Sequence, residues 1–156
     1  MWVYKTGRSE EKKMVLYQFE NDRKYDRASD YLEGFNGVIQ SDVYQVYANI
    51  KDIKNMGCFA HIRRKLVEVM DVAPHTPKKS HLDTAMTYAI NNEKYLRYYI
   101  EDGRVEISNN SAERCCKSFV IGRKNFLFSN SINGAKASGA AYSIIESAKM
   151  NGLKPY

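Results

Sequence analysis

Apolar residues recur at two spacings along the chain, and the change of spacing predicts where strands and helices alternate. Two short apolar runs, over residues 2–4 and 14–19, flank a polar turn, as is typical of a β-hairpin. Residues 22–35 carry apolar or small side chains at helical spacing, which predicts a helix. The brief apolar run over 37–40 then predicts a buried strand that delivers Asp42 at its carboxyl end.

The alternation of elements continues through the middle of the chain. Residues 44–50 suit a short helix, and residues 71–79 hold two prolines, which favours a connector. The other elements expected here are a strand over 56–60 that feeds a helix, a helix capped by Ser80, a helical piece over 95–100 and an extended run over 105–107.

A stretch in the last third of the chain combines an acid with cations. Asn110 is a good helix N-cap and Glu113 stands three residues later, so the pair predicts a capping box and a helix through about Phe119. A Gly-Arg-Lys-Asn turn is expected next, with Arg123 and Lys124 supplying charge suited to phosphate. A carboxylate held on the first turn of a helix suits a metal bound against a nucleic acid backbone.

A helix rich in small residues closes the chain. Asn133 and Gly134 predict a turn, and residues 135–150 predict a helix that stops at Asn151 and Gly152. The side chains expected to face inward are those of Ala137, Ala141, Ile144, Ile145 and Ala148.

Composition adds constraints on partners and compartment. The 24 basic residues against 18 acidic ones give a net charge of +6, which favours a polyanionic partner without establishing it. Cys58, Cys115 and Cys116 form no metal-ligand spacing and cannot all pair internally, so reduced thiols in a cytoplasm are expected. No apolar run approaches the ~20 residues of a membrane span, so no membrane partner is expected.

Six separate blocks of sequence carry a resemblance to a known family: residues 37–44, 57–65, 109–114, 122–128, 134–138 and 145–155. In content and order, they resemble the end of the catalytic domain of bacterial insertion-sequence-66 family transposases. The resemblance implies a ribonuclease-H-like α/β fold, with a mixed sheet flanked by helices and an Asp-Asp-Glu metal site that cuts and joins DNA.

The resemblance carries over to particular residues. Asp42 matches the family's second acid and Glu113 its glutamate, whereas the first acid lies on a central strand that precedes residues 2–4 in the family. We therefore expect a truncated domain without that strand, which binds Mg²⁺ or Mn²⁺ more weakly than the two-ion site of the intact enzyme and has little activity alone. The expected DNA contacts are Arg63, Arg64, Lys65, Arg114, Arg123 and Lys124, with Asn109, Asn110, His61 and Asn125 in support.

The same comparison divides the chain into three parts. Residues 1–70 carry the second acid, residues 71–79 are a connector in place of the family's helical insertion, and residues 80–156 carry the glutamate. The expected partners are DNA, at element ends and targets, and either a second copy of the chain or an intact transposase.

Other interpretations stay open. The chain could be a non-catalytic DNA-binding remnant, or a decayed open reading frame with no cellular role. Asp42 could be only a helix N-cap, Glu113 only a capping-box residue and His61 a structural histidine. Glu146 is another candidate acid, but an ion-paired position on a packed helix is the simpler interpretation.

Overall fold

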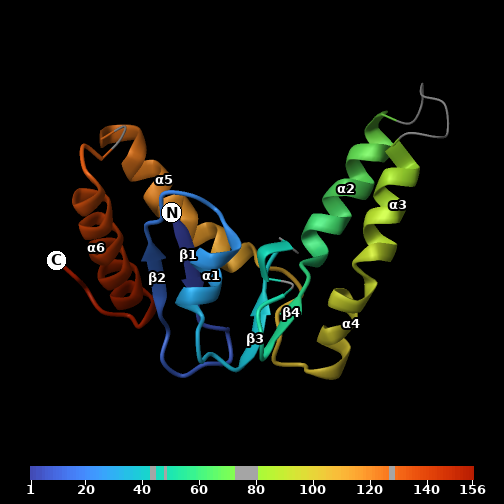
Figure 1. Cartoon of the computed structure of the whole chain (residues 1–156), viewed down its shortest axis with the longest axis horizontal. Helices are drawn as coiled ribbons and strands as arrows, with labels where there is room; N and C mark the ends of the chain where they lie inside the picture. Colours follow the sequence, from blue (N-terminus) through green and yellow to red (C-terminus); the bar gives the residue numbers. More distant parts are fainter. Residues whose placement is uncertain (43–44, 48, 73–80, 127–128) are drawn as a thin grey trace. The chain divides into compact units, whose positions relative to one another are not determined.

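The structure is a computed structural model that describes residues 1–156 except 43–44, 48, 73–80 and 127–128 (Figure 1). Both helices and strands are present, which confirms the predicted mixed α/β class. The elements in order are β1 (Trp2–Lys5), β2 (Val15–Gln18), α1 (Tyr25–Tyr31), β3 (Gly37–Gln40), the 3₁₀ turn η1 (Gln45–Tyr47), β4 (Ile53–Met56), α2 (Phe59–Val72), α3 (His81–Asn91), α4 (Glu93–Glu101), α5 (Asn110–Phe126) and α6 (Ile132–Met150).

The chain forms two compact units. The first joins Met1–Arg23 to Asn110–Tyr156, and the second is Lys24–Asn109. The strands are divided in the same way, because β1 pairs with β2 and β3 pairs with β4 in separate two-stranded sheets. The division of the chain at residues 71–79 stays a prediction.

The first unit is built on the predicted hairpin, which is confirmed. β1 and β2 pair antiparallel with Trp2 opposite Gln18. The ladder extends past the strands, because the N–H of Thr6 donates to the carbonyl of Met14 at 3.0 Å and the N–H of Met14 donates to the hydroxyl of Thr6 at 2.9 Å. Neighbouring residues alternate in direction along such a ladder, so the backbone of Val15 faces away from β1.

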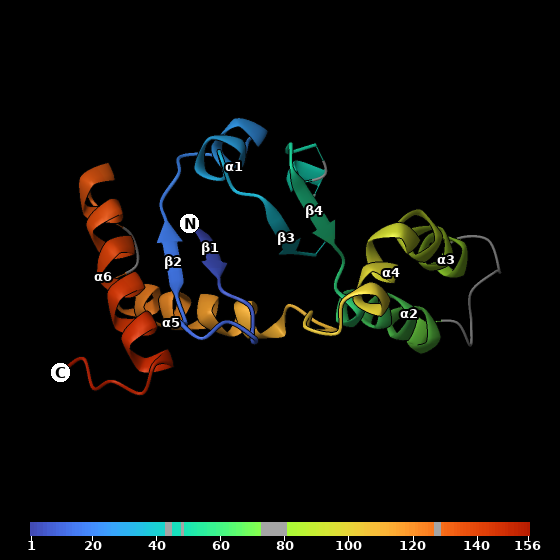
Figure 2. The ribbon, with the colours of Figure 1, turned by 90° about the horizontal axis from the view of Figure 1, so that it is seen from below.

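Helix α6 runs along this outer edge of β2 (Figures 1 and 2). The hydroxyl of Ser147 accepts the N–H of Val15 at 2.9 Å and donates to the carbonyl of the same residue at 3.2 Å. The hydroxyl of Ser143 accepts the N–H of Tyr17 at 2.8 Å. Serine side chains on a helix thus take the place of a neighbouring strand.

Two more residues extend this contact at either end. The side-chain amide of Asn151 accepts the N–H of Lys13 at 3.2 Å and donates to its carbonyl at 2.7 Å. A Cβ at Gly139 would lie 2.7 Å from the carbonyl oxygen of Tyr17, so glycine is needed for the close approach of helix and strand. We call the four residues, spaced four apart on one helix face, the edge cap: Gly139, Ser143, Ser147 and Asn151.

The predicted inward face of the closing helix is wrong for three of its five residues. Ala137 and Ala141 are exposed, and Ile144 is 71% exposed, whereas Ile145 and Ala148 are half-buried. The helix meets a strand edge, whose free backbone groups need hydrogen-bonding partners. Small and hydroxyl side chains therefore face β2, and Ala137, Ala141 and Ile144 turn to solvent.

Gly122 lies inside a helix, and the predicted turn after Phe119 is wrong. α5 continues without a break from Asn110 to Phe126. A Cβ at Gly122 would collide with the hydroxyl of Tyr142. This glycine therefore makes room for a side chain of α6 and does not end the helix.

The start of α6 also differs from the prediction. Ser131 is the N-cap, because its hydroxyl accepts the N–H of Gly134 at 3.0 Å. Asn133 and Gly134 consequently belong to the first turn of the helix, and no separate turn precedes residue 135.

Aromatic rings form the core between the hairpin and these helices. Tyr17 is 5% exposed, and its ring centroid lies 5.7 Å from that of Tyr142 and 6.3 Å from that of Phe119. Its hydroxyl donates to the carbonyl of Cys115 at 2.7 Å. Burial raises the pKa of Tyr17 above its usual range, so the phenol stays a donor.

The second unit contains the predicted strand over 37–40, while the next strand is displaced. β4 covers Ile53–Met56 and runs parallel to β3, with Gly37 opposite Ile53. The prediction of a strand over 56–60 is wrong, because the N–H of Gly57 donates to the carbonyl of Tyr95 at 2.9 Å and leaves the ladder. The strand was not predicted because Lys54 interrupts the apolar run: its side chain is exposed, whereas its neighbours Ile53 and Asn55 are half-buried.

Three helices complete the second unit. α2 contacts α3, and α4 contacts both α3 and β4.

The remaining predictions for the second unit are met in part. α1 spans Tyr25–Tyr31, shorter than the predicted 22–35, and the helix predicted over 44–50 is present as the short η1. Residues 105–107 form no strand. Most of the predicted connector lies outside the described residues, and so does Ser80, the predicted cap of the next helix. No helix within the described ranges is long and apolar enough to cross a membrane.

The edge cap generates a stability prediction. We expect Ser147→Ala to lower the free energy of unfolding by about 1–3 kcal/mol, because it leaves the buried N–H of Val15 without a partner. The measurement is urea denaturation followed by circular dichroism. Ser138→Ala is the matched control: this hydroxyl donates only to Gly134 of its own helix, so the change should stay within about 0.5 kcal/mol. Equal losses in both variants would contradict the role of the edge cap.

Candidate metal and nucleic-acid site

Asp42 follows a strand whose last residues are firmly paired. The N–H of Ser41 donates to the carbonyl of Met56 at 3.0 Å, one residue beyond β3. The hydroxyl of Ser41 is 3.2 Å from Oδ1 of Asn55, and Ser41 is buried. Asp42 is exposed, so the strand presents a carboxylate to solvent at its carboxyl end, as predicted.

The surroundings of Asp42 include side chains from α2 and α3. The hydroxyl of Tyr88 donates to the backbone carbonyl of Asp42 at 3.3 Å. Burial raises the pKa of Tyr88, the nearby carboxylate of Asp42 raises it further, and the ammonium of Lys65 lowers it. The structure thus brings Asp42 and Lys65, both predicted site residues, around one tyrosine.

The other predicted residues of α2 lie on its first turns. Arg63 and Arg64 are exposed, and Lys65 forms an exposed ion pair with Glu68 at 3.2 Å. His61 is half-buried, and its backbone N–H donates to the carbonyl of residue 58. The three cations are therefore accessible, and the ion pair to Glu68 is weak enough to exchange for another anion.

The segment that leads to Glu113 is anchored within the second unit. Asn109, a predicted supporting residue, is held through its backbone, and its side-chain oxygen is buried without a hydrogen-bond partner among the described residues. The anchors are Gln40 Nε2 to the carbonyl of Glu106, the N–H of Phe59 to the carbonyl of Ile107 at 3.1 Å, and the N–H of Asn109 to Sγ of Cys58 at 3.4 Å.

Glu113 lies in the first turn of α5, as predicted, and is exposed. The partial positive charge of a helix N-terminus stabilises an ionised carboxylate at this position. Glu113 belongs to the first compact unit and Asp42 to the second. The meeting of the two acids in one metal site therefore stays a prediction.

The cations of α5 are distributed differently from the prediction. Arg114, Arg123, Lys124 and Asn125 are all exposed. Because the helix continues through Phe126, Arg123 and Lys124 lie about 15 Å from Glu113 along the helix axis, rather than beside it in a turn. Lys117, which we did not predict as a site residue, is exposed one turn after Glu113. Helical spacing could have identified it, because the predicted helix through about Phe119 already included Lys117, one turn after Glu113.

Glu146 behaves as an ion-paired structural residue. It lies 3.1 Å from Nζ of Lys149, and the hydroxyl of Ser118 donates to it at 3.3 Å. Its position on α6 between these partners explains the acid without a metal.

The chemistry of the two candidate acids fits a hard divalent cation. Carboxylate oxygens are the ligands that Mg²⁺ prefers, and both side chains are exposed. In the part of the chain that the structure describes, no group of three or more His, Cys, Asp or Glu side chains could hold a metal ion. The three cysteines are free thiols.

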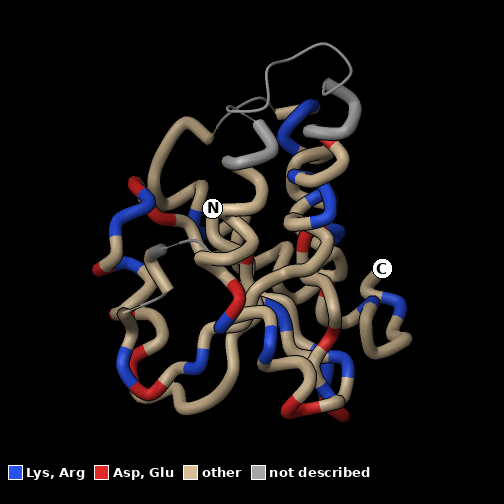
Figure 3. The backbone as a smooth tube through the Cα atoms, turned by 90° about the vertical axis from the view of Figure 1, so that its right-hand side faces the viewer, with Lys and Arg blue, Asp and Glu red and all other residues tan. Residues whose placement is uncertain are grey.

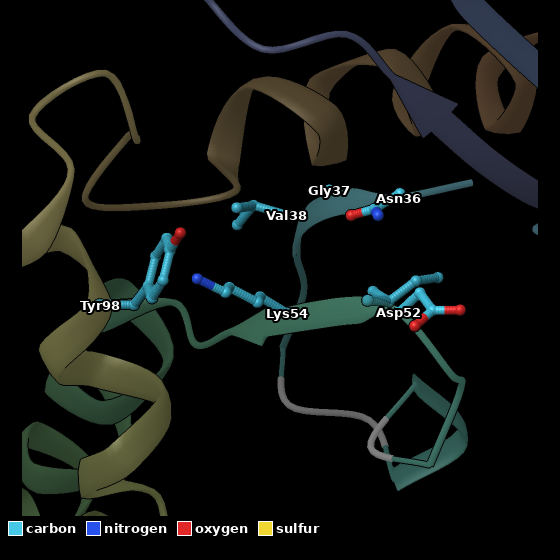
Figure 4. A pocket seen from close by; sticks show the side chains of 7 residues that line it. Asn36, Gly37, Val38, Asp52, Lys54 and Tyr98 are labelled. Atoms are coloured by element: carbon cyan, nitrogen blue, oxygen red, sulfur yellow. The ribbon is translucent and has the colours of Figure 1, made fainter.

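A shallow cavity of about 460 Å³ lies elsewhere in the second unit (Figure 4). It is lined at the beginning of β3 and β4 by residues that include Asn36, Asp52 and Tyr98, and the ammonium of Lys54 lies 5.3 Å from the Tyr98 ring centroid. Asp42 follows the opposite end of β3, so this cavity is separate from the candidate site.

Charge is mixed along the whole backbone. Basic and acidic segments alternate in Figure 3, and neither sign is confined to one stretch of the chain. The net charge of +6 therefore does not by itself define a binding face, and local placement of cations must do so.

The described structure thus places one candidate acid at a strand end, the other at a helix start, and exposed cations on α2 and α5 of a mixed α/β fold. A family model described as "Transposase IS66 family" matches residues 1–79 and 68–137. The chain belongs to the IS66 transposase family, which supports a role related to transposition. The two matched segments overlap at residues 68–79, where the connector was predicted.

Two similar proteins come from Sinorhizobium fredii (strain NBRC 101917 / NGR234). The uncharacterized protein y4qI is 26% identical over 205 aligned positions, which cover 91% of this chain and 38% of the relative. The uncharacterized protein y4jD is 25% identical, with coverage of 91% and 40%. The chain thus spans about two fifths of the length of these relatives. No solved structure matches the chain.

The neighbourhood of Asp42 can be tested by titration. We expect Asp42→Asn to lower the pKa of Tyr88, because the substitution removes a nearby negative charge but keeps the backbone carbonyl. Lys65→Gln should raise that pKa. The measurement is NMR of ring-labelled tyrosine across alkaline pH, with Tyr88→Phe to identify the signal. Asp26→Asn, an exposed acid on α1, is the control and should have no effect. If the pKa of Tyr88 were unchanged in Asp42→Asn, the carboxylate of Asp42 would not lie near Tyr88.

Proposed function

We propose that this chain supplies Asp42 and Glu113 as metal ligands in a transposase that cuts and joins DNA strands. The observation that carries the proposal is the family match over residues 1–79 and 68–137, which includes both acids. Their exposure, at a strand end and in the first turn of a helix, is consistent with access to a metal ion and a phosphate.

A ribonuclease-H-like fold is the second part of the proposal. The element order supports it: an antiparallel hairpin, a helix, and then β3 and β4 paired in parallel. Asp42 directly follows the parallel strand β3, where side chains of different strands can converge at the carboxyl edge of a sheet.

Each group of residues has a separate role. Asp42 and Glu113 hold Mg²⁺ or Mn²⁺, and two such ions, when bound, stabilise the charge on the entering and leaving oxygens of a phosphodiester. Arg63, Arg64 and Lys65 on α2 contact the DNA backbone, as do the cations of α5. Lysine and arginine bind phosphates without reading the bases, so these contacts position DNA and leave sequence choice to other groups.

A non-catalytic DNA-binding role is the second candidate. The observation in its favour is that the described residues contain no cluster of three metal-binding side chains. Two carboxylates alone hold a divalent ion weakly. Under this alternative, the chain binds DNA through its cations, and neither chelator nor loss of Asp42 changes the affinity.

Two measurements test the catalytic proposal. We expect Asp42→Asn and Glu113→Gln each to abolish Mg²⁺- or Mn²⁺-dependent nicking of a supercoiled plasmid, because an amide cannot supply the lost charge. Each should also weaken Mn²⁺ binding, measured by calorimetry, by at least about tenfold. Glu93→Gln is the matched control: it is an exposed acid in the first turn of α4 and should leave both results unchanged.

The results separate the two candidates. Metal-dependent nicking that persists in both variants would refute the assignment of these acids. Salt-sensitive DNA binding without any metal-dependent nicking would favour the non-catalytic role.

A further inference from the structure

One face of α5 presents an acid and two lysines in a line. An α-helix turns about 100° per residue, so Lys117 lies about 40° around the helix from Glu113, and Lys124 about 20°. Val120 lies between them on the same side. We call Glu113, Lys117, Val120 and Lys124 the α5 stripe.

The α5 stripe is open to solvent. All four residues are exposed, Val120 to 49%, and α5 buries no residue among those that the structure describes. Within the described part of the first unit, neither Lys117 nor Lys124 forms an ion pair or hydrogen bond. Both ammonium groups are therefore available to an external anion.

Other cations of the first unit are placed differently. Arg123 lies about 80° away from Glu113 around α5. Lys136 is exposed on a different helix, α6. Among the cations of α5 in its described range, Asn110–Phe126, only the two lysines of the α5 stripe share a direction with the acid, at about 6 Å and 16 Å along the helix axis.

We propose that the α5 stripe is a phosphate-binding face for one DNA strand, and that Lys117 binds the phosphate nearest to Glu113. This inference rests on the proposed function and adds a residue to it. The axial separation of Lys117 and Lys124 is about 10 Å, which equals the rise of about three phosphates of one strand along a duplex axis, at 3.4 Å each. A lysine ammonium suits this task, because it is a flexible point charge.

Electrostatics gives Lys117 a second role. An exposed carboxylate that faces DNA is repelled by the phosphates, and an ammonium one helical turn away offsets this repulsion where screening is incomplete. Glu113 can then approach the DNA backbone before any metal is bound. Lys117 therefore acts on DNA binding and positions the strand near the acid.

The test is DNA binding without metal. Fluorescence anisotropy of a short labelled duplex is measured with the full chain in EDTA over a series of KCl concentrations. We expect Lys117→Gln to weaken binding several-fold and to reduce the slope of log affinity against log salt by about 0.9, the value for one lost phosphate contact. Lys117→Arg should retain the slope of the unmodified chain.

Lys136→Gln is the matched control, since it removes one exposed lysine from the same unit but not from the α5 stripe. It should leave the slope unchanged, and circular dichroism should show that both variants are folded. Equal effects of Lys117→Gln and Lys136→Gln, or no effect of Lys117→Gln, would overturn the inference and leave the metal-dependent function standing. Absence of salt-sensitive binding by the unmodified chain would overturn both.

Discussion

The hydrogen bonds between the edge cap and the outer backbone of β2 are the constraint on which the first unit depends. A two-stranded hairpin is marginally stable alone and leaves both of its edges unpaired. The hydroxyl of Ser147 accepts the N–H of Val15, and that of Ser143 accepts the N–H of Tyr17. Each of these N–H groups would cost about 1–3 kcal/mol if left buried and unpaired. α6 is thereby fixed to the hairpin. The ring of Tyr142 on α6 packs against Phe119 on α5. The same hydrogen bonds therefore also fix the orientation of α5, which carries Glu113.

The second unit holds its acid by different means. Parallel pairing of β3 and β4 continues to Ser41, so Asp42 emerges directly from an ordered ladder. The start of α2 is joined to the segment that precedes α5 through Cys58, whose sulfur accepts the N–H of Asn109. The two candidate acids are thus each supported by backbone hydrogen bonds, within their own units, before any metal is considered.

The chain belongs to the IS66 transposase family, and its residues can be divided into those with a structural role and those that are exposed without one. Several residues of this chain have a structural role: Ser147 and Asn151 bond to the backbone of a strand edge, and Gly122 makes room for a tyrosine. Other positions have no such explanation within the described structure. Asp42, Lys117 and Lys124 are exposed, as the proposed contacts with a metal ion and a nucleic acid backbone require.

The sequence by itself determined the mixed α/β class, the hairpin, the strand before Asp42 and the place of Glu113 on the first turn of a helix, because each depends on local periodicity or capping. Tertiary contacts decided the rest. Gly122 was predicted to begin a turn after the helix, but glycine is also the residue that allows close approach, and only the position of Tyr142 distinguishes the two. The exposed face of α6 was likewise undetermined, since apolar spacing does not reveal that the helix meets backbone groups along a strand edge instead of an apolar surface.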